Sequence, residues 1–280
     1  MNDHGPPGPR LVAATGTLLT TPLGWVMDAV AEAGFSAIEV LLGHDPETRD
    51  PDKVLGFARQ AGLDVPVVHG PYMLLLRGVL GANYVEKTRR SVELARAMGA
   101  GLLVAHAPFR WELGARRWAE LQADDEAREH GVRFGMENLF PVAGQTFSSV
   151  VTPAQLGAFR HVVFDTSHFG VAGIDLFDAW EALADRVAHL HVSDYLGNGR
   201  DSHAPIGAGV LPLEAFLSHV GRCGWVGTVT LELDCRPFLG TRDCLVGFLA
   251  RERAKAQSLL DGRAPPTVTP TAPGVSRPGR

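Results

Sequence analysis

Short apolar runs alternate with longer segments of helical periodicity along most of the chain. Each short run is rich in Val, Ile, Leu and Phe, which is typical of a buried parallel strand. In the segments that follow, apolar residues recur at helical spacing. The predicted strands are Leu11–Ala14, Ala37–Leu41, Val65–His69, Leu102–His106, Arg133–Glu137, His161–Asp165, Ala188–Val192 and Thr228–Leu233. The predicted helices are Pro22–Ala33, Pro51–Ala61, Asn83–Met98, Ala115–His130, Pro153–Phe159, Asp175–Ala184, Pro212–Cys223 and Arg242–Leu260.

Residues at the ends of the predicted helices support these positions. Proline stands near the first position of four helices, and an N-cap residue precedes three of these prolines. Glycine follows the first four helices, where a left-handed residue commonly ends a helix. The dipeptides are Thr21-Pro22, Asp50-Pro51, Thr152-Pro153 and Leu211-Pro212, and the glycines are Gly34, Gly62, Gly99 and Gly131.

The alternation predicts the fold class. Eight strands and eight helices in about 250 residues are the elements of a single (β/α)8 TIM barrel, placed here over residues 11–262. The rival α/β architecture is an open, doubly wound sheet, which normally has a glycine-rich phosphate loop after its first strand. The segment at that place, AATGTLLTTPLG, matches neither GxGxxG nor a P-loop, so the barrel is favoured.

Both ends of the chain differ in composition from this core. Residues 1–10 are rich in Gly and Pro and are expected to be flexible. Residues 263–280 are rich in Pro and contain too few large apolar residues to fold, so a disordered tail is predicted. The whole chain of 280 residues has 45% hydrophobic and 20% charged residues, as expected for a globular protein with a sizeable core.

Charge and composition exclude several classes of protein. The formal net charge of −5 and the pI of about 6.1 provide no overall attraction to nucleic acid or to an anionic membrane. No stretch approaches 18 consecutive apolar residues, and the N-terminal sequence MNDHGPPGPR lacks the apolar core of a signal peptide. Cys223, Cys235 and Cys244 form no CxxC pair, which argues against a disulfide framework and a thiolate zinc site. A cytoplasmic protein without a membrane partner is predicted.

Histidine and acidic residues gather at the ends of the predicted strands. The C-terminal strand ends of this barrel carry its chemistry. Carboxylates and imidazoles crowded there would repel one another and shift their pKa values unless a cation neutralised them. Nitrogen and oxygen ligands without thiolate suit a divalent ion, which could be Zn²⁺, Mn²⁺, Co²⁺ or Mg²⁺. These residues are His69, His106, Glu137, Asp165, His168, His191 and Glu232, with Asp201 and His203 in the loop after the seventh strand.

Other residues have more than one interpretation. Glu39, within the second strand, could line the pocket or form a structural ion pair. His189 is expected to point to the side of its strand opposite to His191. Phe109 and Trp111, just after the fourth strand, could form a wall of the pocket. Arginines that could contact phosphate or hydroxyl groups of a substrate are Arg77, Arg110 and Arg200.

These motifs resemble those of the xylose isomerase-like barrel superfamily, which contains sugar isomerases and epimerases and the endonuclease IV family of abasic-site nucleases. The resemblance extends from about Leu11 to Leu260. The motifs that carry it are Phe-Asp-Thr-Ser-His at 164–168, His-Val-Ser-Asp at 191–194, Asp-Ser-His at 201–203 followed by Pro-Ile-Gly-Ala-Gly, and Leu-Glu at 231–232.

In the isomerase and epimerase branch, the resemblance implies one divalent ion held by Glu137, Asp165, His191 and Glu232. Glu137 and Glu232 would be the catalytic pair, one removing a proton next to a carbonyl and the other returning it. The metal would polarise the substrate oxygens and stabilise an enediolate. The substrate would be a small polyhydroxylated molecule such as a sugar, a sugar phosphate or a cyclitol. Residues expected to contact it are His168, Tyr72 and Arg200.

In the endonuclease IV branch, the resemblance implies three zinc ions and nine ligands, and every ligand has a candidate here. His69, His106, His168, Asp201 and His203 would join the four core residues. Tyr72, three residues after His69, matches a tyrosine that the nucleases place against DNA.

Other features favour the isomerase over the nuclease. The segment AGFSAIEV at 33–40 reads like the second strand of sugar isomerases. His-Ala-Pro at 106–108 and Asn-Leu-Phe-Pro at 138–141 depart from the His-Pro-Gly and Asn-Thr-Ala-Gly of the nucleases. Basic and aromatic residues are not interleaved in the loops, as tracking of a nucleic-acid backbone would require. A metal-dependent isomerase or epimerase is therefore predicted, with nucleic acid as a partner only under the alternative. A homo-oligomer remains open.

Overall fold

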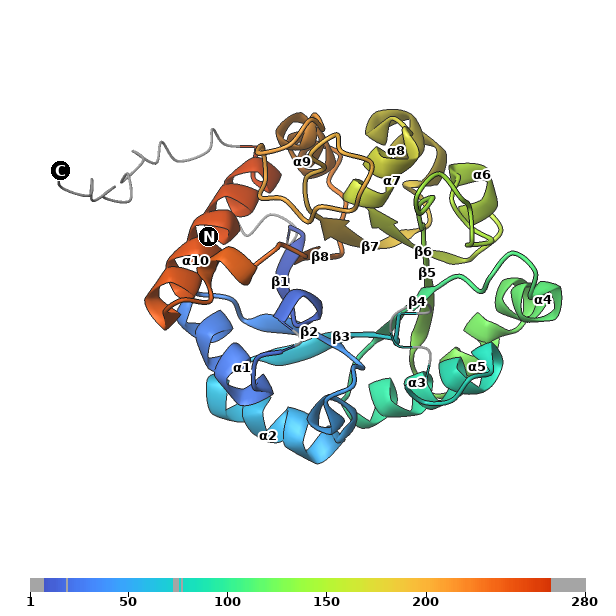
Figure 1. Cartoon of the computed structure of the whole chain (residues 1–280), viewed down its shortest axis with the longest axis horizontal. Coiled ribbons are helices and arrows are strands. Elements are labelled where there is room, and N and C mark those ends of the chain that lie inside the picture. Colours follow the sequence, from blue (N-terminus) through green and yellow to red (C-terminus); the bar gives the residue numbers. More distant parts are fainter. Residues whose placement is uncertain (1–7, 19, 73–75, 77, 263–280) are drawn as a thin grey trace, which may run out of the picture.

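The strands pair in sequence order and close into a barrel surrounded by helices (Figure 1). This computed structural model describes residues 8–18, 20–72, 76 and 78–262, and the part so described contains eight parallel strands. The predicted (β/α)8 barrel is thereby confirmed. The flexible segment and the tail that we predicted lie outside the described residues at 1–7 and 263–280. Arg10, which we had placed in the N-terminal segment, begins the first strand.

The strand positions agree closely with the sequence pattern. Four of the eight strands in the described residues have the predicted bounds, and the last strand ends two residues early, before Glu232. The strands are β1 (Arg10–Ala14), β2 (Ala37–Leu41), β3 (Asp64–His69), β4 (Leu102–His106), β5 (Arg133–Glu137), β6 (His161–Asp165), β7 (Val187–Val192) and β8 (Thr228–Leu231).

Two helices of the described residues are additional to the eight predicted, and several helix ends differ by one to three residues. The predicted helix 115–130 is divided at Gln122, and the acidic first turn of the second part favours a helix N-terminus there. A short helix directly after β6 was not predicted. The helices are α1 (Leu23–Glu32), α2 (Pro51–Ala61), α3 (Tyr84–Ala97), α4 (Leu113–Leu121), α5 (Ala123–Glu129), α6 (Pro153–Leu156), α7 (Thr166–Ala172), α8 (Leu176–Leu183), α9 (Leu213–Arg222) and α10 (Arg242–Leu260), with 3-10 turns η1 (Gly16–Leu18), η2 (Pro46–Arg49) and η3 (Arg236–Phe238).

Two of the three predicted N-caps are confirmed. The Asp50 side chain accepts hydrogen bonds from the backbone N–H groups of residues 52 and 53, and Thr152 forms a capping box with Gln155. At α1 the prediction was wrong, because Pro22 itself is the N-cap and its extended backbone delays the helix to Leu23. The four glycines predicted to follow helices all have positive φ angles, from 69° to 86°.

The barrel interior is polar near the C-terminal ends of the strands and apolar beneath them. Val67, Leu102, Val104 and Val163 form a buried cluster inside the strands. Gly135 faces this cluster, since a Cβ atom there would lie 2.8 Å from Cγ2 of Val163. A larger hydrophobic core fills the space between the strands and the helices. Polar residues at the interior positions near the C-terminal strand ends therefore lie on a rigid, closely packed base.

Strand register places the predicted site residues side by side. His106 of β4 is the partner of Glu137 of β5, and Asp165 of β6 is the partner of His191 of β7. Because parallel strands present their C-terminal ends at one face, these residues meet at the barrel mouth. In the described part of the chain, no helix is both long enough and apolar enough to cross a membrane.

Candidate metal centre

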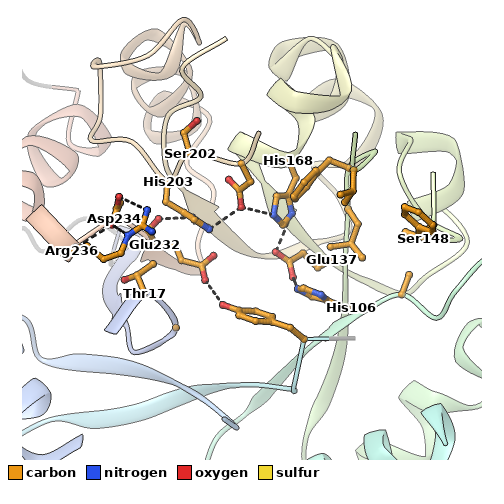
Figure 2. Close-up of a pocket in the computed structure, with 18 of the residues that line it drawn as sticks. Thr17, His106, Glu137, Ser148, His168, Ser202, His203, Glu232, Asp234 and Arg236 are labelled. Atoms are coloured by element: carbon orange, nitrogen blue, oxygen red, sulfur yellow. Dashed lines mark hydrogen bonds and ion pairs between the residues drawn. The ribbon is translucent and has the colours of Figure 1, made fainter. Parts of the chain in front are cut away.

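A cavity of about 480 Å³ opens at the C-terminal ends of the strands (Figure 2). Its volume lies in the range of small-molecule binding sites. The floor and one side are polar, and Glu137, His106, His168, His203 and Glu232 point into it. Its apolar wall is formed by Phe109, Leu139, Phe140, Val142 and Phe147, and Leu239, after β8, also lines the cavity.

Four side chains predicted to share a metal ion converge at the base of this cavity. Glu137, Asp165, His191 and Glu232 each offer one ligand atom, and these atoms lie within 4.8 Å of one another. Nδ1 of His191 lies 3.0 Å from Oε1 of Glu137, 3.7 Å from Oδ2 of Asp165 and 3.4 Å from Oε2 of Glu232. All four residues are buried. They come from β5, β6, β7 and the position just after β8.

A second group shares Glu137 with the first. Nε2 of His106 lies 3.0 Å from Oε2 of Glu137, and Nε2 of His69 lies 3.4 Å from the same oxygen. These three residues also satisfy the spacing of a candidate metal site. Glu137 therefore has one carboxylate oxygen facing each group.

A third group is centred on Asp201. Its Oδ2 atom lies 3.4 Å from Nε2 of His168 and 2.8 Å from Nε2 of His203. Asp201 and His203 are separated only by Ser202, so an extended segment would direct both side chains the same way, and with His69 and His106 they could complete a second metal position. Instead, His203 has a left-handed φ of 43°, and His69 and His106 lie with Glu137. The expected set of four is thus divided between two groups.

Helix α7, which the sequence analysis missed, orients two of these residues. Asp165 is its N-cap, and Oδ1 accepts hydrogen bonds from the backbone N–H of His168 and from the Ser167 hydroxyl. The other oxygen, Oδ2, is thereby turned toward His191. The signals for this helix were an aspartate in the N-cap position and the left-handed Gly173 that follows it.

The orientation of the imidazoles fits a divalent ion. Nδ1 of His69, His168 and His203 lies 2.6, 2.8 and 2.9 Å, respectively, from a backbone carbonyl oxygen, which can only accept a hydrogen bond. Nδ1 therefore carries a hydrogen, and Nε2 of each ring faces a carboxylate. When no second proton is bound to the ring, Nε2 and the carboxylate oxygen are both acceptors. Two acceptors facing each other require a proton or a cation between them. This outer hydrogen bond to a carbonyl is typical of metal-binding histidine.

Unpaired buried atoms support the same conclusion. Nε2 of His69, Oε2 of Glu137 and Oδ2 of Asp165 are buried, and none forms a hydrogen bond with any residue that the structure describes. Burying such atoms without a partner is costly. A divalent ion in the first group would satisfy Oδ2 of Asp165, and one in the second group would satisfy Nε2 of His69 and Oε2 of Glu137.

Glu137, Asp165, His191 and Glu232 form the core group, and two of them have strongly shifted pKa values. Burial alone would raise the pKa of Glu137, but the neighbouring His106 and His191 outweigh it and hold the pKa well below its ordinary value. Burial alone would lower the pKa of His191, but the charges of Glu39 and Glu137 outweigh it and raise the pKa well above its ordinary value. Protons and a metal ion therefore compete for these atoms.

In the third group too, neighbouring charges outweigh the effect of burial on the pKa values. Burial opposes ionisation of Asp201, yet His203 and His168 hold its pKa well below the ordinary value. The pKa of His203 is raised to about 9, because the charge of Asp201 outweighs the effect of burial. Asp201 and His203 form a close ion pair that also orders the loop after β7.

The residues predicted to contact substrate lie in different places. His168 lines the cavity beside Phe140, whose ring centroid lies 4.7 Å from the imidazole. Tyr72 lines it too and donates a hydrogen bond to Glu232. Arg200 and Arg110 are exposed and do not line the cavity, and Arg77 lies outside the described residues. Arg236 lines the cavity and is paired with Asp234.

The position predicted for His189 was wrong. His189 and His191 are two residues apart, and residues two apart in a strand share one face. Both imidazoles point into the barrel and lie beside Glu39. Glu39 lies beneath the cavity and does not line it.

Asp194, the last residue of the His-Val-Ser-Asp motif, orders the loop above the site. Its carboxylate accepts hydrogen bonds from the backbone N–H groups of Tyr195, Gly207 and Leu211. A Cβ atom at Gly209 would collide with this carboxylate and with the carbonyl oxygen of Tyr195. Asp194 thus explains part of the Pro-Ile-Gly-Ala-Gly sequence, a role that the sequence analysis did not identify.

Two loops build the apolar wall. Phe109, after β4, pairs with Ser148, after β5, in an antiparallel bridge, and the backbone N–H of Arg110 donates to the carbonyl of Phe147. The Phe109 ring stacks on Trp111, with ring centroids 4.9 Å apart. The prediction that Phe109 walls the pocket is confirmed, whereas Trp111 is exposed and does not line the cavity.

Fold and site together define a (β/α)8-barrel protein with a carboxylate and imidazole centre at its mouth. The family described as xylose isomerase-like TIM barrel matches residues 27–259, and the chain belongs to this family. An uncharacterized protein of Mycobacterium leprae is 30% identical over 230 residues, which are 73% of this chain and 81% of that protein.

Solved structures share the fold. A D-tagatose 3-epimerase-like protein superposes with a TM-score of 0.69 and 18% identity, covering 90% of this chain and 97% of that one. An AP endonuclease, family 2, from Brucella melitensis gives a TM-score of 0.65 and 19% identity, covering 81% and 93%. Barrels named for both branches of the resemblance are therefore among its structural neighbours.

Proposed function

We propose that this protein is a divalent-metal-dependent isomerase or epimerase acting on a small polyhydroxylated substrate. The observation that carries the proposal is the convergence of Glu137, from β5, and Glu232, from just after β8, at the base of one cavity. A proton transfer next to a carbonyl needs a base and an acid within reach of the same carbon. Two glutamates at one site meet that need.

Glu137, Asp165, His191 and Glu232 would hold the ion. When bound, it would polarise the substrate carbonyl and hydroxyl oxygens and stabilise the negative charge that develops there. The two glutamates would act from either side of the substrate carbon. One removes the proton beside the carbonyl, and the other returns a proton to the same or the neighbouring carbon.

Neighbouring side chains prepare this pair. Glu137 is ionised at neutral pH, because His106 and His191 hold its pKa well below the ordinary value. Tyr72 donates its hydroxyl hydrogen to Oε1 of Glu232 at 3.1 Å, which orients that carboxylate. His168 lies at the cavity surface and would contact a substrate hydroxyl.

The cavity suits a small molecule with a polar and an apolar side. Polar atoms of the substrate would face the metal ligands, and its carbon skeleton would lie against Phe140 and Phe147. The fold neighbour named as a D-tagatose 3-epimerase-like protein supports the proposed reaction class. The apolar wall of this cavity is less suited to the charged phosphate backbone of a nucleic acid.

Solvent exchange tests the reaction directly. The Mn²⁺-loaded protein would be incubated in D₂O with ketoses and inososes, and ¹H NMR would follow loss of the proton next to the carbonyl. Wild type is expected to exchange at least one substrate of the panel. Glu137→Gln and Glu232→Gln should each reduce exchange by about 10³-fold or more, because they remove the proton acceptor.

Glu252→Gln is the matched control, because Glu252 is another buried glutamate but lies on α10 away from the cavity. It should retain exchange. Wild-type protein that binds the ion yet exchanges no member of the panel would contradict the proposed class, as would full exchange by Glu137→Gln.

One observation favours a second candidate function. All nine residues that the resemblance assigns to a trinuclear zinc centre lie at the barrel mouth, in three adjoining groups. A phosphodiester hydrolase acting on abasic DNA is therefore the alternative. Three zinc ions per chain by elemental analysis, with cleavage of an abasic oligonucleotide and no ketose exchange, would replace the isomerase by the nuclease.

A further inference from the structure

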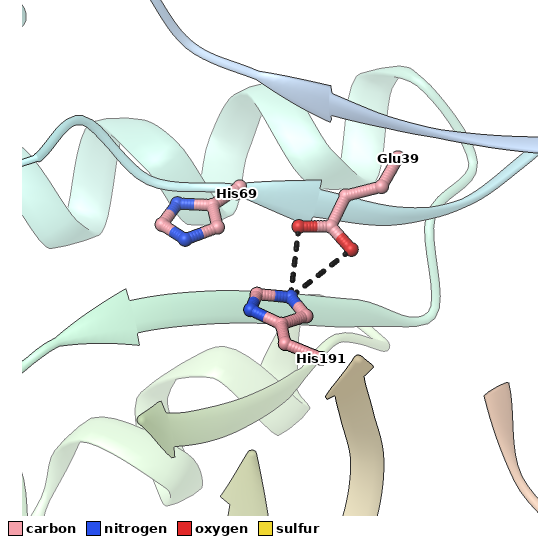
Figure 3. A group of neighbouring side chains, drawn as sticks. All are labelled: Glu39, His69 and His191. Carbon is pink, nitrogen blue, oxygen red and sulfur yellow. Dashed lines mark hydrogen bonds and ion pairs between the residues drawn. The ribbon is translucent and has the colours of Figure 1, made fainter. Parts of the chain in front are cut away.

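Glu39 lies in the middle of β2 and projects into the barrel beneath the metal centre (Figure 3). Its carboxylate is buried and has three neighbours that can donate hydrogen bonds. Nε2 of His191 lies 3.1 and 3.3 Å from its two oxygens, and Nε2 of His189 lies 3.0 Å from Oε2. The Thr230 hydroxyl donates to Oε2 at 2.6 Å.

His191 stands between Glu39 and the proposed metal ligands. Its Nε2 faces Glu39, and its Nδ1 faces Glu137 at 3.0 Å. A neutral imidazole carries one hydrogen, and an ionised carboxylate can only accept. A hydrogen held at Nε2 by Glu39 leaves the Nδ1 lone pair directed at the core group.

We infer that Glu39 is a positioning residue that fixes the His191 tautomer and ring orientation for metal binding through Nδ1. The other imidazoles support this by contrast. His69, His168 and His203 each donate Nδ1–H to a backbone carbonyl and present Nε2 to a carboxylate. At His191 the two ring nitrogens exchange roles. Nε2 faces the buried carboxylate of Glu39 in place of a backbone carbonyl, and Nδ1 faces the carboxylate of Glu137.

The neighbours of Glu39 hold it in this role. Nδ1 of His189 lies 2.6 Å from the Thr228 hydroxyl, which can donate to it and leave the His189 hydrogen on Nε2, facing Glu39. Glu39 is thus an acceptor from β7 and β8 at once. A hydrogen-bonded carboxylate behind a metal-binding histidine is a recurrent second layer of metal sites.

One competing arrangement uses the same residues. Glu39, His69 and His191 offer atoms within 4.8 Å of one another, so an ion could in principle bind between them. That ion would need the Nε2 lone pair of His191, and the hydrogen would then move to Nδ1. The two arrangements therefore differ in which His191 nitrogen binds the metal.

The test measures metal affinity. The inference rests on the proposed function in one respect, the binding of an ion at the core group, and it does not depend on which reaction is catalysed. Zn²⁺ affinity of the full chain would be measured by competition with a chromophoric chelator. Glu39→Gln should weaken binding by about 10–100-fold, because the amide has no negative charge and only one acceptor oxygen for the hydrogens of His191, His189 and Thr230. Glu252→Gln, at a buried glutamate outside the site, should bind as wild type does. Unchanged affinity in folded Glu39→Gln would overturn the inference.

Two further measurements keep the inference testable if Glu39→Gln does not fold. Thr230→Val removes one donor to Glu39 and should weaken Zn²⁺ binding relative to wild type, and unchanged affinity would count against the inference. In the Zn²⁺-loaded wild type, ¹⁵N NMR of labelled histidine should show His191 protonated at Nε2 and metal-bound at Nδ1. Protonation at Nδ1 would overturn the inference and favour the competing arrangement. Wild type that binds no metal would instead contradict the proposed function.

Discussion

Tyr72, just after β3, donates a hydrogen bond to Oε1 of Glu232, just after β8, at 3.1 Å. The pKa of Tyr72 is raised well above its ordinary value by burial and by the nearby charge of Glu232. The phenol therefore stays protonated and remains a donor throughout the physiological pH range. This contact joins two distant segments at the cavity and leaves Oε2 of Glu232 directed at the core group.

Tyr72→Phe should therefore impair catalysis more than folding. Without the phenol hydroxyl, the Glu232 carboxylate loses one orienting bond, and kcat should fall by about 10-fold or more. The thermal unfolding midpoint should change little. Tyr195→Phe, which removes a hydroxyl from the exposed loop after β7, is the control. Equal kcat values for both variants would show that the Tyr72 contact does not serve the reaction.

Metal content should show whether the Asp201 group holds ions in addition to the one proposed for the core group. Asp165→Asn removes a buried ligand atom from the core and should abolish tight binding of the proposed ion. His203→Ala and Asp201→Asn should retain about one ion per chain if the proposed isomerase is correct. Elemental analysis after gel filtration measures this. Loss of one or two ions in the loop variants, with the core ion retained, would indicate a multinuclear centre.

The apolar wall should govern substrate binding. Phe147→Ala removes an aromatic ring from the cavity surface and should raise KM several-fold while leaving kcat nearly unchanged, because the ring contacts substrate and transition state alike. Leu121→Ala, at an exposed position on α4, should leave both constants unchanged. A fall in kcat at constant KM would assign Phe147 a different role.

The loop after β7 should depend on Asp194. Asp194→Ala would leave three backbone N–H groups without their acceptor and should lower the free energy of unfolding by about 2–4 kcal/mol. Gly209→Ala should also destabilise the protein, through collision with the Asp194 carboxylate. Urea unfolding measures both effects. Wild-type stability of Asp194→Ala would refute the role given to this carboxylate.

His161 should make stability depend on pH below neutrality. Burial and the nearby arginines lower its pKa in the folded protein, against the opposing charge of Asp124. The unfolded chain therefore binds the proton first as the pH falls below about 6.5, and stability is lost. This residue can contribute a slope of at most about 1.4 kcal/mol per pH unit. Urea unfolding of His161→Gln from pH 7.5 to 5.5 should show a shallower slope. Identical slopes would contradict this.

Much of the fold was predictable because local signals and burial agree. Parallel strands buried on both faces appear as continuous apolar runs, so β2, β4, β5 and β6 were predicted with their observed bounds. The short helix α7 was missed, since seven residues carry too little periodicity to be recognised. The break at Gln122 was missed for a similar reason, because apolar spacing continues across it.

The sequence by itself determined the barrel, the order of its strands and the set of residues at the strand ends. Which residues share a group was decided only by the tertiary structure, through strand register and ring orientation. His191 meets Glu39 and Glu137 at once because closure of the barrel brings β2, β5 and β7 around one interior. Those contacts join residues more than 50 positions apart, and no local pattern along the chain encodes them.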